Sequence, residues 1–440
     1  MSGERMNVGF ISLGCAKNLV DSEMILGMLS SAGAAIVNDP EDADVIFINT
    51  CGFIEAAKEE TIDTIREMKD FDKKLIVTGC YAKRYEDKIL NEMPFVDKVI
   101  SLDDYPHLHE ILAEVLSEYS LKLKPLDYEK RMLTTSVFSP YVKIAEGCDN
   151  HCAFCAIPLI RGHFHSRPMD DILNEVRGLI EKGAKEINLI SQDTTRYGFD
   201  LTGRKKTLLP ELLKKITAIK GLWRVRFLYL YPDEVTDELL DVVEKNKKIA
   251  TYFDIPLQHI SDSVLKKMHR RDDETSSIAV IRTIKEHMPD AIIRSTFIVG
   301  FPGETEADFE KLRRFVEAGH IDRLGVFTYS REEDTPAYKY GDDVPEEQKQ
   351  KRKDILMATQ RKITRAKNKS KKGTVHETLV EAYDPETGFY YGRSEAFAPD
   401  DVDGCIVFQA DGDLSAGDIV SVEITDQFRY DLIGDMVDAS

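Results

Sequence analysis

The 440-residue sequence predicts an α/β protein in three parts: a doubly wound parallel sheet, a partial barrel of six βα units, and a small all-β barrel. Three observations lead to this prediction. Strand-like apolar runs alternate with helical patterns over most of the chain, the second series of runs has six units, and helical periodicity disappears after about residue 373. The expected domain bounds are 1–125, 135–372 and 373–440.

The first part contains three β-rich runs, VGFISLG, DVIFINT and KLIVTG. They alternate with helical patterns such as SEMILGMLSSAG and EETIDTIREMKDF. Strands and helices that alternate at this spacing indicate a parallel sheet with helices on both faces.

The second part contains six further runs, separated by helix-like segments: YVKIAEG, KEINLIS, WRVRFLYL, YFDIPLQ, AIIRSTFIVG and RLGVFTYS. A complete eight-unit barrel takes about 250 residues, which is more than these six units span, so we expect an open or partial barrel. Residues 346–372 hold 11 bases and 3 acids at helical spacing, which predicts a solvated helix that leaves the barrel. In the third part, short strands separated by Gly, Asp and Pro predict a small all-β barrel.

The overall composition is that of a globular chain, with 42% hydrophobic and 31% charged residues. No run approaches the roughly 18 apolar residues that a membrane span needs, which excludes the membrane-spanning class. The first residues, MSGERMNVGFISLG, have neither a basic leader nor a small-residue cleavage site, so we expect a cytoplasmic protein. Its seven cysteines then indicate metal binding or catalysis rather than a disulfide framework.

The net charge of −19 is unevenly distributed. Residues 1–140 carry 25 acids and 15 bases, residues 141–372 carry 37 and 42, and residues 373–440 carry 16 and 2. The three segments therefore have charges of −10, +5 and −14. An intensely acidic end beside a mildly basic middle points to a charged partner.

The sharpest motif is a C-x3-C-x2-C cluster, formed by Cys148, Cys152 and Cys155 directly after the first strand of the second part. Three thiolates can hold three irons of a 4Fe-4S cluster and leave the fourth iron open. Zinc is the alternative, but a structural zinc site needs a fourth protein ligand. The nearby candidates for that ligand are His151, His163 and His165.

A second set of cysteines, Cys15, Cys51 and Cys80, is spread over the first part. Each cysteine follows a predicted parallel strand, and the carboxyl ends of such strands share one edge of a sheet, so the three thiols can converge. A single cysteine would more often be a small buried hydrophobe, but three equivalent positions favour a second three-cysteine 4Fe-4S cluster. Cys405 alternates like a strand residue, and we expect it to pack in the core.

The C-x3-C-x2-C spacing, with Phe154 before the last cysteine, resembles the radical S-adenosylmethionine superfamily. The resemblance implies that the open iron binds the methionine moiety of the cofactor, and that an electron from the cluster releases a 5'-deoxyadenosyl radical. It also implies cofactor contacts at Phe154, Gln192, Gln258, Gly300 and Glu304. The alternative for Gln258 is that it only satisfies backbone groups at a strand end.

The complete pattern is similar to that of the methylthiotransferases, whose three-part order covers nearly the whole chain. In that family an auxiliary cluster on three cysteines precedes the radical barrel, and a TRAM domain follows it. The matching strings are SLGCAKNLVDSEMILG, IPLQHISDSVLKKMHR and FIVGFPGETEADF. The sequence departs from the family at His165, where arginine is common, and at Asp334, where glycine is common. These departures put local loop geometry in doubt, not the cluster ligands.

The resemblance implies insertion of a methylthio group at an unactivated C–H bond. One S-adenosylmethionine would methylate sulfur at the auxiliary cluster, and a second would be cleaved at the radical cluster so that its radical abstracts hydrogen from the substrate. An electron donor such as flavodoxin or ferredoxin is then expected as a partner. A non-catalytic iron–sulfur scaffold or zinc adaptor is the alternative, although scaffold sites are normally closed by four ligands.

The family has two clients, an aspartate of the twelfth small-subunit ribosomal protein and an adenosine of transfer RNA. The terminal segment offers only Arg393 and Arg429 for phosphates, so we expect it to recognise a basic ribosomal protein rather than RNA. The strings NTCGFIEAAKEE and SLGCAKNLVDSE also look more like the ribosomal-protein branch. The alternative is a transfer-RNA adenosine methylthiotransferase that uses the basic residues 349–372, with the acidic end serving only solubility.

Overall fold

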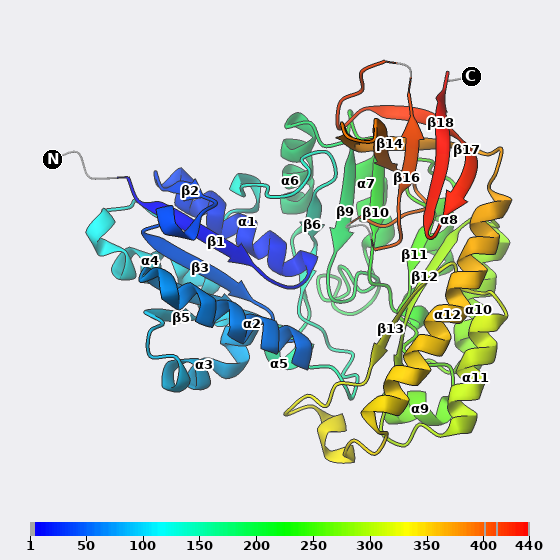
Figure 1. Cartoon of the computed structure of the whole chain (residues 1–440), viewed down its shortest axis with the longest axis horizontal. Helices are drawn as coiled ribbons and strands as arrows, with labels where there is room; N and C mark the ends of the chain where they lie inside the picture. The colour runs from blue at the N-terminus through cyan, green and yellow to red at the C-terminus, as the bar shows by residue number, and fades with distance from the viewer. Residues whose placement is uncertain (1–4, 400–401, 411, 439–440) are drawn as a thin grey trace.

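The computed structural model describes residues 5–399, 402–410 and 412–438. It contains a parallel α/β part at the N-terminus, a partial barrel in the middle of the chain, and a closed β-barrel at the C-terminus, as expected. Figure 1 shows the N-terminal part beside the partial barrel and the C-terminal barrel across the upper end of the latter. Across the described residues, every helix is too short or too polar to cross a lipid bilayer.

The N-terminal part is a five-stranded sheet of order β2-β1-β3-β4-β5, in which all neighbouring strands are parallel. The central strand β3 is buried on both faces: Val45 and Phe47 face a cluster with α1 and α4, whereas Ile46 and Ile48 face α2 and α3. The sheet is therefore doubly wound. Its elements are β1 (Asn7–Ser12), α1 (Ala16–Ser31), β2 (Ala35–Val37), β3 (Val45–Thr50), α2 (Glu55–Met68), β4 (Lys74–Gly79), α3 (Cys80–Glu92), β5 (Lys98–Ile100) and α4 (Leu108–Val115).

The middle part has six parallel strands in sequence order, paired as β6-β9-β10 and β11-β12-β13. A parallel bridge between Val225 and Ile249 joins the two groups, while β6 and β13 are the outer strands. This is the predicted partial barrel. Its strands are β6 (Tyr141–Lys143), β9 (Glu186–Ile190), β10 (Arg224–Phe227), β11 (Tyr252–Asp254), β12 (Ile292–Val299) and β13 (Arg323–Thr328).

Helices between these strands bury their apolar faces in one large core with the strands. The main helices are α6 (Met169–Glu181), α7 (Leu209–Thr217), α8 (Asp237–Glu244), α10 (Glu274–His287), α11 (Glu306–Glu317) and α12 (Glu346–Ser370). Shorter elements are β7 (Ala145–Glu146), α5 (Ile157–Arg161), β8 (His165–Ser166) and α9 (Asp262–Lys267).

The long basic helix α12 differs from the prediction of a solvated helix. One face is buried along its whole length, and this face is largely polar. Lys349 pairs with Asp342 at 2.7 Å, and Gln360 donates to the carbonyl oxygens of Ile321 and Asp322. The prediction was wrong for this face because polar side chains can be buried when the packed loops offer them partners.

The C-terminal barrel closes in the order β14-β15-β16-β18-β17 and packs on the partial barrel. Arg393 is buried at this interface, where it lies 2.6 Å from Glu186 of β9. Glu186 also pairs with Arg226 at 3.2 Å, so a buried ion-pair network joins the two parts. The barrel strands are β14 (Val375–Asp384), β15 (Phe389–Arg393), β16 (Ile406–Gln409), β17 (Ile419–Phe428) and β18 (Asp431–Val437).

Candidate functional site

A cavity of about 440 Å³ lies between the N-terminal sheet and the partial barrel. All six cysteines of the two predicted sets line it, together with polar and aromatic side chains from both parts. Its volume is in the range of small-molecule sites. The lining residues are Cys15, Lys17, Asn18, Cys51, Phe53, Cys80, Cys148, Asn150, Cys152, Phe154, Cys155, Ile157, Ile160, Arg161, Gln192, Asp193, Tyr229, Leu230, Tyr231, Pro256, Gln258, Arg270 and Phe327.

The N-terminal cysteines converge because their loops approach one another without intervening side chains. Gly14, with φ of +94°, lies against Cys51, and a Cβ atom placed on it would come 3.1 Å from the Cys51 sulfur. Gly52 lies equally close to the next loop, where a Cβ atom would come 2.8 Å from Cα of Tyr81. The glycines beside Cys15 and Cys51 thus permit the three strand-end loops to meet.

The other three cysteines lie in the loop between β7 and α5, at the mouth of the partial barrel. The backbone N–H of Cys155 donates to the carbonyl of Cys152 at 3.0 Å, which closes a tight turn. The N–H of Cys148 donates to the carbonyl of Gly162 at 3.1 Å, and the N–H of Ala153 to that of Met268 at 2.8 Å. Backbone hydrogen bonds therefore fix this loop at both ends.

The predicted cofactor contacts divide into two groups. Phe154, Gln192 and Gln258 line the cavity, and the Gln192 amide donates to Glu146 at 2.7 Å. Gly300 and Glu304 are not among the lining residues. The Glu304 carboxylate accepts hydrogen bonds from the backbone N–H groups of Gly300 and Phe301, and so stabilises its own loop. A cofactor role for these two residues stays a prediction.

Three of the nine non-glycine residues that have positive φ in the described part of the chain lie in or beside the cavity. Tyr229 and Gln258 both line it with positive φ values of 64° and 69°, and His151 between the cluster cysteines has φ of 52°. Such conformations cost roughly 1 to 3 kcal/mol each for residues other than glycine, and they typically persist where function requires them.

The thiol spacing distinguishes between a single ion and a cluster. Three thiolates around one tetrahedral zinc ion, with Zn–S bonds near 2.3 Å, lie about 3.8 Å apart. Among the described residues, one group of three candidate ligands has all its ligand atoms within 4.8 Å of one another, and it consists of Asp241, Glu244 and His287. The sulfurs of each cysteine set are therefore spread more widely than this. A cubane cluster spreads its ligands over separate irons, so the wider spacing fits a cluster better than zinc.

Two of the candidate fourth zinc ligands near Cys148, Cys152 and Cys155 also make contacts away from the thiols. The His163 imidazole Nδ1 lies 2.9 Å from Asp149, and its side chain is 91% exposed. His165 is exposed as well and contacts the His163 carbonyl at 3.2 Å.

Burial dominates the chemistry of the free thiols. It raises the pKa of Cys51 to about 11 and that of Cys148 to about 12, and it also raises the pKa of Cys80 and Cys155. Cys15 is the exception, because the charge of nearby Lys17, backbone hydrogen bonds and the charge of Arg161 outweigh burial and lower its pKa. Iron ligation requires the thiolates, so cluster binding at these sites releases protons.

A buried network of charges connects the two cysteine sets. Asp21 of α1 lies 2.5 Å from Lys143 and 2.6 Å from Arg161, and Glu146 lies 2.6 Å and 3.2 Å from the same two bases. Arg161 also donates to the sulfur of Cys80 at 3.5 Å. Lys17 donates to the carbonyl of Ser191 at 3.2 Å and lies 3.6 Å above the ring of Tyr229. The network thus fixes the N-terminal sheet on the barrel around the cavity.

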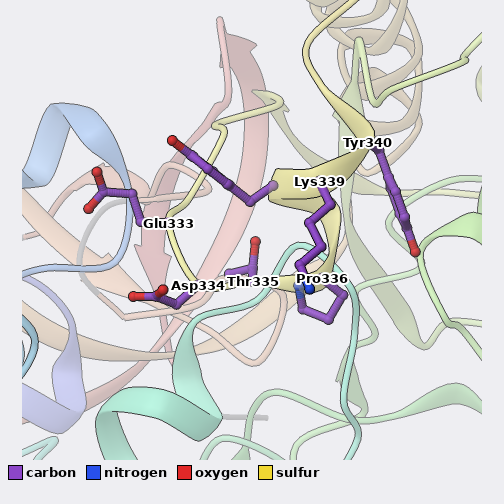
Figure 2. Close-up of a pocket in the computed structure, with 7 residues that line it drawn as sticks. Glu333, Asp334, Thr335, Pro336, Lys339 and Tyr340 are labelled. Atoms are coloured by element: carbon purple, nitrogen blue, oxygen red, sulfur yellow. The ribbon is translucent and has the colours of Figure 1, made fainter.

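A second hollow, of about 750 Å³, lies apart from these cysteines and is formed by a single segment after β13 (Figure 2). Figure 2 shows Glu333 and Tyr340 at opposite ends of it. Asp334 has φ of 62°, which explains why glycine is the common residue at this position of the resembled family. Glu332, just before the hollow, pairs with Arg84 of α3 at 2.8 Å, so this segment also holds the N-terminal part. Its lining residues are Glu333, Asp334, Thr335, Pro336, Tyr338, Lys339 and Tyr340.

Full-length relatives decide the family. The chain is 44% identical over 456 residues to the ribosomal protein uS12 methylthiotransferase RimO of Acetivibrio thermocellus, with 99% of each chain covered. It is 46% identical to the RimO proteins of Alkaliphilus oremlandii and Aquifex aeolicus, over 436 and 429 residues; 98% of this chain is covered in both cases, and 99% and 97% of the relatives. The chain belongs to the RimO family of radical S-adenosylmethionine methylthiotransferases.

Three family models match successive parts of this RimO-family chain. They are the uncharacterized protein family UPF0004 over residues 7–101, the radical SAM superfamily over residues 142–316, and the TRAM domain over residues 373–437.

Solved structures confirm the fold. The radical S-adenosylmethionine methyltransferase TsrM from Kitasatospora setae matches with a TM-score of 0.54 and 12% identity, covering 76% of this chain and 74% of that one. The cobalamin-dependent radical enzyme OxsB matches with a TM-score of 0.52 and 12% identity over 81% and 56% of the two chains.

Several cavity residues were not found from the sequence. Lys17, Arg161 and Arg270 all line the cavity, and two of them donate to cysteine sulfurs: Arg161 to Cys80, and Arg270 to Cys152 at 3.8 Å. The available signal was weak: Lys17 and Arg161 follow Cys15 and Cys155 by a few residues, but basic side chains near a cysteine are common on protein surfaces. Cys405, expected in the core, is half-buried in the C-terminal barrel.

Proposed function

We propose that this chain methylthiolates an aspartate of ribosomal protein uS12. Two observations support the proposal: full-length similarity to RimO proteins, and six cysteines from two parts of the chain that line one cavity. The second observation matters most, because a transfer between two centres requires both to face one substrate pocket. The proposed division is a methylthiotransferase domain (1–125), a radical barrel with its exit helix (135–372), and a TRAM domain (373–440).

The residues present fit two 4Fe-4S clusters and S-adenosylmethionine. Cys148, Cys152 and Cys155 would hold the radical cluster, and Cys15, Cys51 and Cys80 the auxiliary cluster. Phe154, Gln192 and Gln258 would contact the S-adenosylmethionine. When bound, these groups supply a 5'-deoxyadenosyl radical and a methylated sulfur.

The chain itself provides enclosure and orientation. Tyr229, Tyr231 and Phe327 contribute aromatic side chains to the cavity, and a bound substrate packed against them would shield reactive intermediates from water. The ion pairs of Asp21 with Lys143 and Arg161 hold the two cysteine sets at a fixed separation. Orientation of this kind is a major part of catalysis, because a reactant held in place no longer loses its freedom in the reaction step.

The acidic surface of the C-terminal barrel favours a basic protein as the substrate. Of its two arginines, Arg393 is buried in ion pairs with Glu186 and Glu381, which leaves Arg429 exposed. At least eight acids of this barrel are exposed among the described residues: Glu377, Glu386, Asp413, Asp418, Glu423, Asp426, Asp435 and Asp438. Such a surface attracts a basic ribosomal protein and repels RNA phosphates.

Strand register places two of these acids side by side. Glu423 of β17 lies directly opposite Asp435 of β18, and both are exposed. Like charges in directly opposed positions destabilise a sheet. None of the ion pairs formed by the described residues includes either carboxylate. A binding role for this face explains why the chain retains the repulsion.

We further infer that the protein works in the cytoplasm with a reductant such as flavodoxin or ferredoxin.

The decisive experiment offers two substrates to the anaerobically reconstituted and reduced enzyme. The enzyme is incubated with S-adenosylmethionine and either ribosomal protein uS12 or unmodified transfer RNA, and each product is weighed by mass spectrometry. We expect a methylthio increment on an aspartate of uS12. An increment on adenosine would contradict the proposed substrate and assign the basic face of α12 to RNA.

Single cysteine variants test the two centres separately. Cys152→Ala is expected to abolish 5'-deoxyadenosine formation, whereas Cys51→Ala should retain it and lose methylthio transfer. Chromatographic detection of 5'-deoxyadenosine and mass spectrometry of uS12 measure the two steps. Methylthio transfer by Cys51→Ala would show that the N-terminal set is not needed.

A further inference from the structure

Each cysteine set receives one hydrogen bond from a buried arginine. Nη2 of Arg161 donates to the sulfur of Cys80 at 3.5 Å, and Nη1 of Arg270 donates to the sulfur of Cys152 at 3.8 Å. The guanidinium groups are almost fully buried, with side chains 4% and 3% exposed. A charge in such surroundings is screened little by solvent, so it acts strongly on whatever the thiolates hold.

Arg161 has an unusual position between the two sets. It is the last residue of α5, six residues after Cys155, yet its sulfur contact belongs to Cys80 in the other part of the chain. Nη1 of Arg161 donates to the Asp21 carboxylate at 2.6 Å. Nη2, which contacts the Cys80 sulfur, also donates to the side-chain oxygen of Asn18. One short helix therefore connects the radical set to the auxiliary set through a single side chain.

We propose that Arg161 is a positioning residue that ties the auxiliary cluster to the radical barrel and raises the reduction potential of that cluster. The inference rests on the proposed function, since it requires a cluster at Cys15, Cys51 and Cys80. Reduction adds a negative charge to a cluster, and a buried cation that donates to a ligand sulfur stabilises the reduced state. Hydrogen bonds to the sulfurs and net charge are the established means by which proteins adjust these potentials.

The geometry favours arginine over lysine in this place. The planar guanidinium reaches Asp21 with one nitrogen and Asn18 and Cys80 with the other. A lysine ammonium is a single charged point and cannot match this fork. Lysine would therefore keep the charge but lose part of the arrangement.

The test measures cluster potentials rather than turnover. A background variant with Cys148, Cys152 and Cys155 changed to alanine would carry only the auxiliary cluster, whose reduction potential is followed by electron paramagnetic resonance during redox titration. In this background, Arg161→Gln is expected to shift the potential to more negative values and Arg161→Lys to restore part of the shift. Arg270→Gln should leave this potential unchanged and shift the radical cluster instead, when measured in a background that lacks Cys15, Cys51 and Cys80.

Arg167→Gln is the matched control for loss of a buried arginine. Arg167 pairs with buried Glu175 at 2.6 Å and donates to the carbonyl of Lys143, and among the described residues its guanidinium makes no hydrogen bond to a cysteine. An unchanged auxiliary potential in Arg161→Gln, or an equal shift in Arg167→Gln, would overturn the inference. Failure of the background variant to bind any cluster at the N-terminal cysteines would instead overturn the proposed function and this inference with it.

Discussion

At the residue scale, Gly52 allows the loops of Cys51 and Cys80 to approach closely because it has no side chain. A Cβ atom there would lie 2.8 Å from Cα and 2.9 Å from N of Tyr81, which are backbone atoms that cannot rotate away. We expect Gly52→Ala to push Cys51 away from Cys80, so that the purified protein loses the iron of the auxiliary cluster. Iron analysis and uS12 mass spectrometry measure the effect, and 5'-deoxyadenosine formation should persist.

Gly178→Ala in α6 is the control, since no atom lies within 4 Å of the added Cβ. It should keep all iron and stabilise the helix by about 1 kcal/mol. Full iron content and normal transfer in Gly52→Ala would show that the loop can adjust.

The residue scale also shows what the sequence could predict about the site. Cys15, Cys51 and Cys80 were predictable because parallel strands end at one edge, a rule that needs only the strand positions. Arg161 was not, because its contact with Cys80 spans 81 residues and depends on how the sheet docks on the barrel. Periodicity and spacing contain no information about such docking.

At the scale of elements, strand β9 anchors the C-terminal barrel through Glu186. Burial raises the pKa of this carboxyl, but the charges of Arg393, Arg226 and Arg224 outweigh burial and lower it to about 2. The folded pKa lies below the ordinary value of 4.5, so the stabilisation is complete above pH 4.5 and is lost as the pH falls toward 2.

Glu186→Gln should therefore destabilise the protein by about 3 kcal/mol at neutral pH, since it leaves buried arginines without their carboxylate. The difference from the parent protein should shrink at pH 3, because Glu186 is then already protonated in the unfolded chain while it is still largely ionised in the folded protein. Urea denaturation at the two pH values measures both effects. A difference of equal size at pH 7 and pH 3 would show that the charge of Glu186 contributes nothing.

The helices and strands were easier to predict from the sequence than the tertiary contacts of their side chains. The alternation of apolar runs gave the six barrel strands, and the shift in pattern near residue 373 gave the terminal β-barrel. The basic composition of α12 predicted a helix but not its buried polar face, because Lys349 and Gln360 are satisfied by loops distant in sequence. Composition shows which residues are charged and does not show which partners tertiary structure brings to them.

At the scale of the whole molecule, charge separation assigns different tasks to different parts. The net charge of −19 is concentrated at the C-terminal barrel, while α12 presents exposed basic side chains such as Arg361, Lys362 and Arg365. An acidic face that selects a basic protein should accelerate association in a salt-dependent way, because screening weakens attraction between exposed charges. We therefore expect the KM for uS12 to rise with ionic strength.

The opposed pair of Glu423 and Asp435 allows a sharper test of the same idea, in which stability and binding change in opposite directions. Glu423→Lys replaces a repulsion with an attraction to Asp435 across the strands, which should stabilise the barrel by up to about 1 kcal/mol. The same change removes negative charge from the face proposed to bind uS12, so KM should rise several-fold while kcat stays constant. Thermal unfolding and steady-state kinetics at two salt concentrations measure the two effects.

Glu286→Lys on α10 gives the same change in net charge away from the C-terminal barrel. If both variants raised KM equally, net charge alone would govern association and the barrel face would have no special role. A rise confined to Glu423→Lys, together with a weaker salt dependence, would localise uS12 recognition to β17 and β18. If the acidic face served only solubility, Glu423→Lys would stabilise the protein without weakening substrate binding. Higher stability together with a higher KM would therefore identify the face as a binding surface, because function there opposes the gain in stability.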